Sequence, residues 1–164
     1  MFGFGLKHRS GEALRRGARA IALGSFVDRS ELEDQGLNEQ ASSTLYFEVL
    51  AHQIYALGLI YGLSLVGRRG WATPDFFFRN VGEALVEAEA AQSLHPGALA
   101  KVLLNRFMDF EGMPSEARKD GKHFEQSASM VAELDSSADH EEIANLLQKH
   151  SESFFHQGKK VFGL

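Results

Sequence analysis

Cysteine is the most consequential absence from this sequence, because none occurs among its 164 residues. Without cysteine the chain cannot form structural disulfides, thiolate zinc sites or iron–sulfur clusters, and it has no thiol nucleophile. A metal site would therefore need histidine and carboxylate ligands. Proline is also scarce, with three residues in the chain, and no long alternation of β-branched residues predicts a strand.

Recognisable catalytic motifs are missing as well. The sequence contains no Gly-x-Ser-x-Gly elbow and no P-loop, and the Gly-Phe-Gly at 3–5 lacks the third glycine of a dinucleotide fingerprint. The His-Glu-Glu at 140–142 lacks the second histidine of the helical zinc-protease motif. Di-iron bundles need Glu-x-x-His, and the nearest motif here is a single Asp120-x-x-His123. These absences favour a non-enzymatic protein, for which we expect no cofactor.

The charge is acidic overall and unevenly distributed. A net charge of −5 disfavours a nucleic-acid partner, since phosphate binding requires a basic surface. Residues 1–30 hold six Lys and Arg against two Asp and Glu, whereas the remaining residues hold eleven against twenty. This basic start predicts a solvated cationic helix face, with an anionic membrane or an acidic partner as the alternative.

The basic start also bears on targeting. Its apolar run at 20–24 is shorter than the ~7–15 residues of a secretory h-region, and we expect a cytoplasmic location. An arginine-rich transit peptide is compatible with the composition, although Glu12 and Asp28 count against it.

Helical periodicity indicates a single all-α domain over residues 1–164, with a short N-terminal arm at 1–10 and a polar connector at 28–40. We expect an antiparallel bundle of five to six helices around a central apolar helix at about 40–69. The other helices are expected at about 10–27, 73–94, 97–112, 115–134 and 139–158.

Local signals mark several of these helix ends. Thr73 followed by Pro74 is typical of an N-cap and a first helical residue. Gly112 before a proline indicates a stop, and Asp139 with Glu142 resembles a capping box.

The central helix is apolar on every face. Its residues 49–67 carry no formal charge, and such a helix is either buried in a bundle or placed in lipid. A membrane-associated protein that uses residues 49–66 is therefore one alternative. His52, Gln53 and Ser64 within that span disfavour it, and we expect no stable membrane insertion.

Glu48 and His52 are polar exceptions in this helix, and their i,i+4 spacing places them on one face. An unpaired buried charge is costly, so they need partners, which could be each other or Tyr46 and Gln53. The alternative function is a small-molecule or metal-binding bundle, enzymatic or not, whose polar pocket is lined by Glu48, His52, Gln53 and Tyr55.

Glu152 and His156 repeat this spacing in the last helix. Both pairs would form a chemically sound metal site if they faced one cavity together with Glu83 or Glu87. Nothing in the sequence brings the pairs together, so we predict no metal. The candidate ligands would be Glu48, His52, Glu152 and His156.

Small residues follow the polar pair along the central helix. Glycine costs ~1 kcal/mol relative to alanine in a helix interior. Ala51, Gly58 and Gly62 therefore predict close contact with a neighbouring helix.

Aromatic residues are more numerous than one small core requires, notably Trp71 with Phe76, Phe77 and Phe78. Aromatic side chains are enriched at protein interfaces. The leading interpretation is therefore a soluble binding module that acts as a homodimer or with a protein partner.

Overall fold

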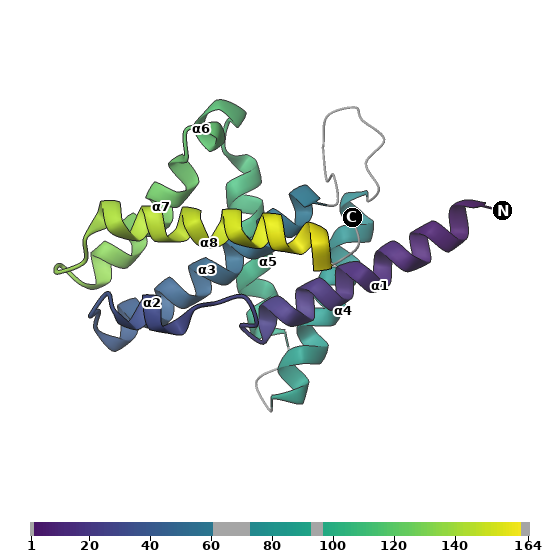
Figure 1. The fold of residues 1–164 in the computed structure, drawn as a ribbon, viewed down its shortest axis with the longest axis horizontal. Coiled ribbons are helices and arrows are strands. Elements are labelled where there is room, and N and C mark those ends of the chain that lie inside the picture. The colour runs from purple at the N-terminus through teal and green to yellow at the C-terminus, as the bar shows by residue number, and fades with distance from the viewer. Residues whose placement is uncertain (1, 61–72, 93–96, 162–164) are drawn as a thin grey trace.

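The computed structural model describes residues 2–60, 73–92 and 97–161, with side chains over 11–60, 73–92 and 97–158. These residues form helices and no strand, which confirms the predicted all-α class (Figure 1). The helices are α1 (Phe2–Ala22), α2 (Arg29–Glu33), α3 (Glu39–Ile60), α4 (Pro74–Ala91), α5 (Ala98–Gly112), α6 (Ser115–Lys119), α7 (Lys122–Leu134) and α8 (His140–Val161).

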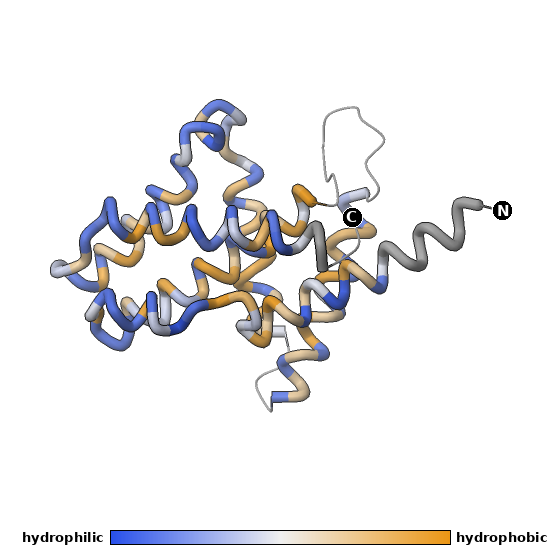
Figure 2. Tube along the Cα trace, viewed as in Figure 1, coloured by the Kyte–Doolittle hydropathy of each residue, from blue (hydrophilic) through white to orange (hydrophobic). Residues whose placement is uncertain are grey.

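Helix α3 is the centre of the arrangement. It packs against α1, α2, α5, α7 and α8, and α8 runs across it in the view of Figure 1. Every described residue from Glu48 to Gly58 is buried, as the all-round apolar pattern of this helix requires. In Figure 2, the helices around α3 carry hydrophobic residues toward the interior and hydrophilic residues toward the outside.

Helix boundaries follow the predicted local signals at several positions. The Thr73 side chain accepts a hydrogen bond from the backbone N–H of Phe76 at 3.3 Å, and Pro74 begins α4. The Asp139 carboxylate accepts from the backbone N–H of Glu142 at 3.0 Å, and α8 begins at the next residue, His140. Both contacts satisfy N–H groups that the helix itself leaves without an acceptor.

The predicted bounds of three helices are wrong. The expected helix at 115–134 is divided into α6 and α7, because Gly121 adopts a φ of +74° and ends the first piece. Helix α1 begins within the predicted arm and ends at Ala22, before Gly24 with its φ of +70°. Helix α8 continues through Gly158 to Val161, since a helical glycine costs stability without forcing a stop.

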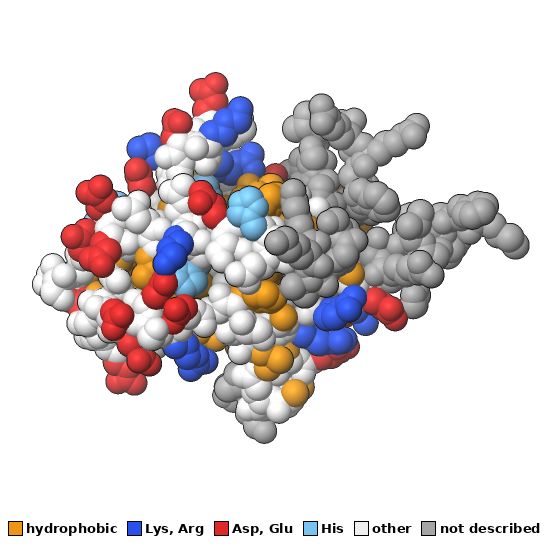
Figure 3. All heavy atoms as spheres, in the orientation of Figure 1, with side chains coloured by type: hydrophobic (Ala, Val, Ile, Leu, Met, Phe, Trp, Pro, Cys, Tyr) orange, Lys and Arg blue, Asp and Glu red, His pale blue; other side chains and the backbone are white. Residues whose placement is uncertain are grey.

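The basic face of α1 is neutralised in part within the chain. Arg15 forms an ion pair with Glu83 of α4, and Arg19 pairs with Glu87 at 3.0 Å. Figure 3 shows basic and acidic side chains next to each other along this part of α1. Asn80 lies between the helices and accepts from Arg15 Nε at 3.0 Å. Two of the arginines in the basic start therefore contact acidic residues of α4.

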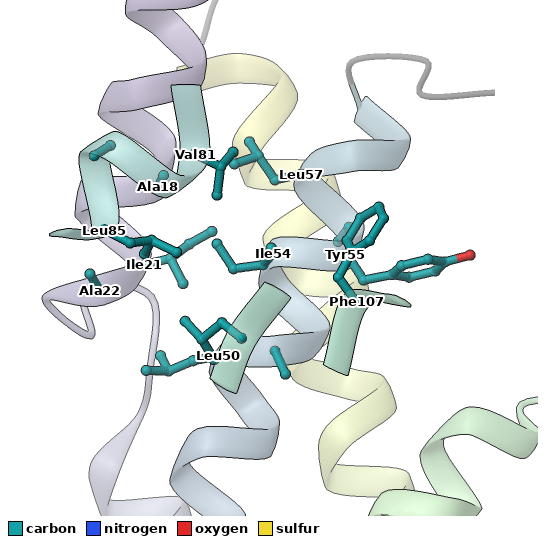
Figure 4. Packing of buried hydrophobic residues seen from close by; sticks show 14 of the residues in the cluster. Ala18, Ile21, Ala22, Leu50, Ile54, Tyr55, Leu57, Val81, Leu85 and Phe107 are labelled. Carbon is teal, nitrogen blue, oxygen red and sulfur yellow. The ribbon is translucent and has the colours of Figure 1, made fainter. Parts of the chain in front are cut away.

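Two hydrophobic clusters flank α3. The larger cluster joins α1, α4, α5 and the C-terminal half of α3, and it includes Ile54, Leu57 and Phe107 (Figure 4). The smaller cluster joins α2, α7 and α8 to the N-terminal half of α3 through Leu45 and Val49. The two halves of one helix therefore belong to two different cores.

No described helix is long and apolar enough to cross a membrane. The predicted span at 49–66 runs beyond Ile60, and its last six residues lie outside the described part of the chain.

Candidate functional site

A buried ion pair lies where α3 meets α5. Arg106 donates from Nε to Glu48 Oε1 at 2.8 Å and from Nη2 to Glu48 Oε2 at 3.0 Å. The side chains are 12% and 4% exposed, respectively. Arg106 also donates to Asp109 at 2.9 Å, and its guanidinium lies 4.8 Å from the centroid of the Phe110 ring. This paired geometry compensates two charges that would otherwise be costly to bury.

Ser127 of α7 extends the ion pair into a network. Its Oγ donates to Glu48 Oε2 at 2.5 Å, and it lies 2.9 Å from Nε2 of His52. The single hydroxyl proton is directed to the carboxylate, so His52 must donate from Nε2 to Ser127. This assignment leaves His52 Nδ1 unprotonated, and Nδ1 has no hydrogen-bond partner among the described residues.

His52 is held in a neutral state by its surroundings. Its ring stacks on Phe110 with centroids 4.3 Å apart and planes 15° apart, and Phe124 lies 4.7 Å away. Burial lowers the pKa of His52 well below its usual value, with the nearby His123 and Arg106 acting in the same direction. The imidazole is therefore a neutral hydrogen-bond donor to Ser127.

The network does not have the arrangement of a hydrolytic triad. A nucleophilic serine would give its proton to histidine, whereas Ser127 gives it to Glu48. Ser127 is also completely buried, so a substrate could not reach its hydroxyl. The chemistry of this network is consistent with positioning α3, α5 and α7 relative to one another.

An open cleft of about 440 Å³ lies beside the network, between the C-terminal half of α3, the α6–α7 corner and α8. The Tyr55 hydroxyl accepts a 2.5 Å hydrogen bond from Nη1 of Arg118, and the same nitrogen donates to Glu111 at 3.1 Å. The lining side chains are Tyr55, Ala56, Leu59, Arg118, Lys119, Asp120, His123, Phe124, Gln148, Ser151, Glu152, Phe155 and His156.

His123 forms the wall between the cleft and the network. It is 7% exposed, and its ring centroid lies 4.1 Å from Phe124 and 5.4 Å from His52. Its Nδ1 is enclosed and has no partner in the described part of the chain. Burial, aided by the charge of Arg118, lowers the pKa of His123 to about 4, so the ring is neutral near pH 7.

The predicted pocket residues occupy different environments. Glu48 and His52 lie inside the buried network, and Tyr55 lies in the cleft. Gln53 is fully buried and donates to the backbone oxygen of Phe26 at 3.2 Å, away from both.

The predicted metal ligands are not brought together. Glu152 and His156 line the cleft, whereas the Glu48 carboxylate is bound by Arg106 and Ser127. Among the residues with described positions, no three His, Asp or Glu side chains are grouped so that they could hold a metal ion.

The predicted packing and interface residues lie mainly in the larger cluster. Ala51 and Gly58 are buried, and a Cβ added to Gly58 would lie 2.9 Å from the Phe107 ring. Phe77 is completely buried within the chain, while Phe76 and Phe78 are partly buried against the same cluster. Gly62 and Trp71 lie outside the described residues.

Arg106 and Ser127, the partners of Glu48 and His52, were not predicted from the sequence. Arg106 and Ser127 each lie in a helix between buried apolar neighbours, Leu103 and Phe110 for the first and Phe124 and Val131 for the second. The sequence signal for such a partner is a polar residue at a position where helical spacing predicts a buried apolar one. Arg118 and His123 of the cleft flank Gly121, the residue that divides the predicted helix.

Comparison of the chain with protein-family models, curated proteins and solved structures gave no match.

Proposed function

We propose that this protein is a non-catalytic helical binding protein that holds a small polar molecule in the cleft beside Tyr55, Arg118 and His123. The observation that carries the proposal is His123, a neutral and almost fully buried histidine that lines an open cleft and lacks a partner at Nδ1. Buried polar atoms are nearly always hydrogen-bonded, so an unsatisfied one beside a cleft is a candidate recognition element.

The charges of the cleft indicate the kind of ligand. Arg118 uses Nη1 for Tyr55 and Glu111, and its buried Nε has no hydrogen-bond partner among the described residues. Lys119 adds a second cation, whereas Asp120 and Glu152 add two carboxylates. A lining of both signs suits a zwitterionic or amide-bearing molecule better than a simple anion.

A titration followed by ¹H–¹⁵N NMR tests this function with four probes: glycine, acetamide, acetate and methylammonium. We expect saturable shifts with glycine and acetamide at residues 118–124, and weaker effects with the two singly charged probes. Arg118→Gln should remove the shifts. Arg79→Gln is the matched control, because Arg79 is an exposed arginine of α4 outside the cleft. Absence of saturable shifts with every probe, or equal effects of the two variants, would contradict the function.

A second candidate function is protein binding, either as a homodimer or with another protein in the cytoplasm. Exposed large apolar side chains support it, because an interface would remove their surface from water. They include Leu23, Phe47, Leu59, Val86, Val102 and Met108. Sedimentation velocity at increasing concentration measures the self-association, and a strict monomer at high concentration would exclude the homodimer.

A further inference from the structure

An apolar groove of about 420 Å³ lies elsewhere on the molecule and shares no lining residue with the cleft. It is enclosed by the C-terminal ends of α1 and α4, the first residue of α2, the middle of α3 and the start of α5. Figure 3 shows hydrophobic side chains at the surface near those ends of α1 and α4. The lining residues are Ala22, Arg29, Tyr46, Phe47, Leu50, Glu89, Gln92, Ala98, Leu99 and Val102.

The apolar walls are exposed where a ligand would contact them. Phe47 is 42% exposed and Val102 is 47% exposed, whereas Leu50 is buried and forms the base. The volume lies within the range of small-molecule sites, roughly 300–1,000 Å³. An elongated apolar ligand would therefore remove solvent-exposed apolar surface from water on both sides of the groove.

Two charged residues border the groove, and only one of them, Arg29, is exposed to a ligand. The Glu89 carboxylate is 2% exposed and accepts hydrogen bonds from the backbone N–H groups of Gly97 and Leu99 at the start of α5. The Arg29 guanidinium lies 5.2 Å from the centroid of the Tyr46 ring and forms no ion pair with any described carboxylate. Glu33 borders an adjoining hollow but does not pair with Arg29. The groove therefore presents an apolar interior and one unpaired cation.

We propose that this groove binds a single-chain amphipathic anion, a medium-chain fatty acid or a close analogue. Its acyl chain would lie against Phe47, Leu50 and Val102, and its carboxylate would bind Arg29. Arginine binds carboxylates through paired hydrogen bonds, and each additional buried methylene group strengthens apolar binding. A second copy of this chain fits the groove less well, because two molecules with a net charge of −5 repel each other and the rim holds a single cation.

Isothermal titration calorimetry of the full chain with decanoate, below its micelle concentration, tests the site. We expect saturable binding of one decanoate per chain. Hexanoate, which lacks four methylene groups, should bind at least about tenfold more weakly. Decyltrimethylammonium keeps the chain and reverses the charge, and it should also bind about tenfold more weakly or worse.

Two pairs of variants separate the head-group contact from the acyl-chain contact. Arg29→Gln should weaken decanoate binding about tenfold and abolish the preference over decyltrimethylammonium. Val102→Glu places a charge in the groove and should abolish binding. The controls are Arg79→Gln, which removes an exposed arginine of α4, and Met108→Glu, which changes an exposed residue of α5 outside the groove. Both controls should bind decanoate as the unchanged chain does.

Three results would overturn the proposal. The first is no saturable decanoate binding. The second is equal binding of decanoate and decyltrimethylammonium, which would remove the role of Arg29. The third is self-association that Val102→Glu abolishes and decanoate leaves unchanged, since the occupant of the groove would then be a second copy of the chain.

Discussion

Glu48, His52 and Gly58 of α3 are all buried, but the helix holds its neighbours in different ways around these residues. In the C-terminal half, Gly58 brings the helix against the rings of Phe77 and Phe107, without any polar contact between these three residues. Around the middle of the helix, Glu48 and His52 are bound through directional contacts to other helices. Burial alone therefore does not distinguish a packing surface from a hydrogen-bonded one.

The kind of contact, apolar packing around Gly58 or hydrogen bonding around Glu48, determines which substitutions each part of α3 tolerates. Apolar packing depends on volume, and it accepts changes that preserve shape at a small cost. A buried polar network depends on every partner, because removal of one leaves another unsatisfied in a low-dielectric environment. We expect substitutions around Glu48 to be more damaging than substitutions around Gly58.

The largest expected effect follows from breaking the buried ion pair. Glu48→Leu removes the carboxylate and leaves the Arg106 guanidinium largely buried without its main partner. The free energy of unfolding should fall by about 3–5 kcal/mol, measured by urea denaturation at pH 7. A loss below about 1 kcal/mol would show that Arg106 reaches water in the variant.

The double variant distinguishes the pair from its separate groups. Arg106→Met alone should also destabilise the chain strongly, because Glu48 is then left buried with Ser127 as its remaining partner. Glu48→Leu with Arg106→Met should be considerably less destabilising than the sum of the two single changes. Additive losses would contradict direct coupling between the two side chains.

The second prediction concerns pH and His123. The folded-state pKa of about 4 lies below the unfolded value of about 6.5, so the unfolded chain binds more protons between these values. The contribution of neutral His123 to the free energy of unfolding is therefore complete above pH 6.5 and is lost as the pH falls. One such histidine should lower the free energy of unfolding by about 2 kcal/mol between pH 6.5 and pH 5.

His123→Leu should remove that part of the pH dependence. Urea denaturation at pH 7 and pH 5 measures it in the unchanged chain and in the variant. His156→Gln is the control, because His156 lines the same cleft but is exposed, and it should keep the full acid sensitivity. Equal acid sensitivity in His123→Leu would contradict the lowered pKa.

The third prediction compares Gly58, in the apolar part of α3, with a glycine of α4. A Cβ at Gly58 would lie 2.9 Å from Phe107, which is buried and cannot move aside freely. A Cβ at Gly82 of α4 would lie 3.6 Å from Leu104, an ordinary contact. Gly58→Ala should destabilise by about 1–2 kcal/mol, while Gly82→Ala should be neutral or stabilising by up to about 1 kcal/mol. Equal thermal unfolding temperatures for both variants would show that Phe107 adapts.

Local chemistry explains which parts of the fold could be predicted. The start of α4 depends on Thr73 and Pro74. The end of α5 depends on Met113, which is extended before the proline that follows it, so both ends could be predicted from adjacent residues. The division at Gly121 could not be predicted, because a glycine within a periodic pattern is compatible either with a continuous helix or with a left-handed backbone conformation that ends it.

The candidate site depends on contacts between residues that are distant in the sequence. The sequence indicated that Glu48 and His52 need partners, but it could not identify Arg106 and Ser127, which lie 58 and 79 residues after Glu48. Their identity follows from the faces that α5 and α7 turn toward α3. The groove that contains Arg29 has the same origin, since residues of five separate helices, α1 to α5, line it.

The smallest expected effect tests an exposed ion pair against the buried one. Arg19 and Glu87 lie 3.0 Å apart, but their side chains are 47% and 52% exposed, so water and salt screen the attraction. Arg19→Gln should lower the free energy of unfolding by no more than about 0.5 kcal/mol, and 1 M NaCl should reduce that difference further. Denaturation of both proteins at low and high salt measures the effect. A salt-independent loss above about 1 kcal/mol would mean that the aliphatic part of Arg19 stabilises the α1–α4 contact by packing. The contact would then resemble the apolar packing around Gly58 more than the ion pair of Glu48.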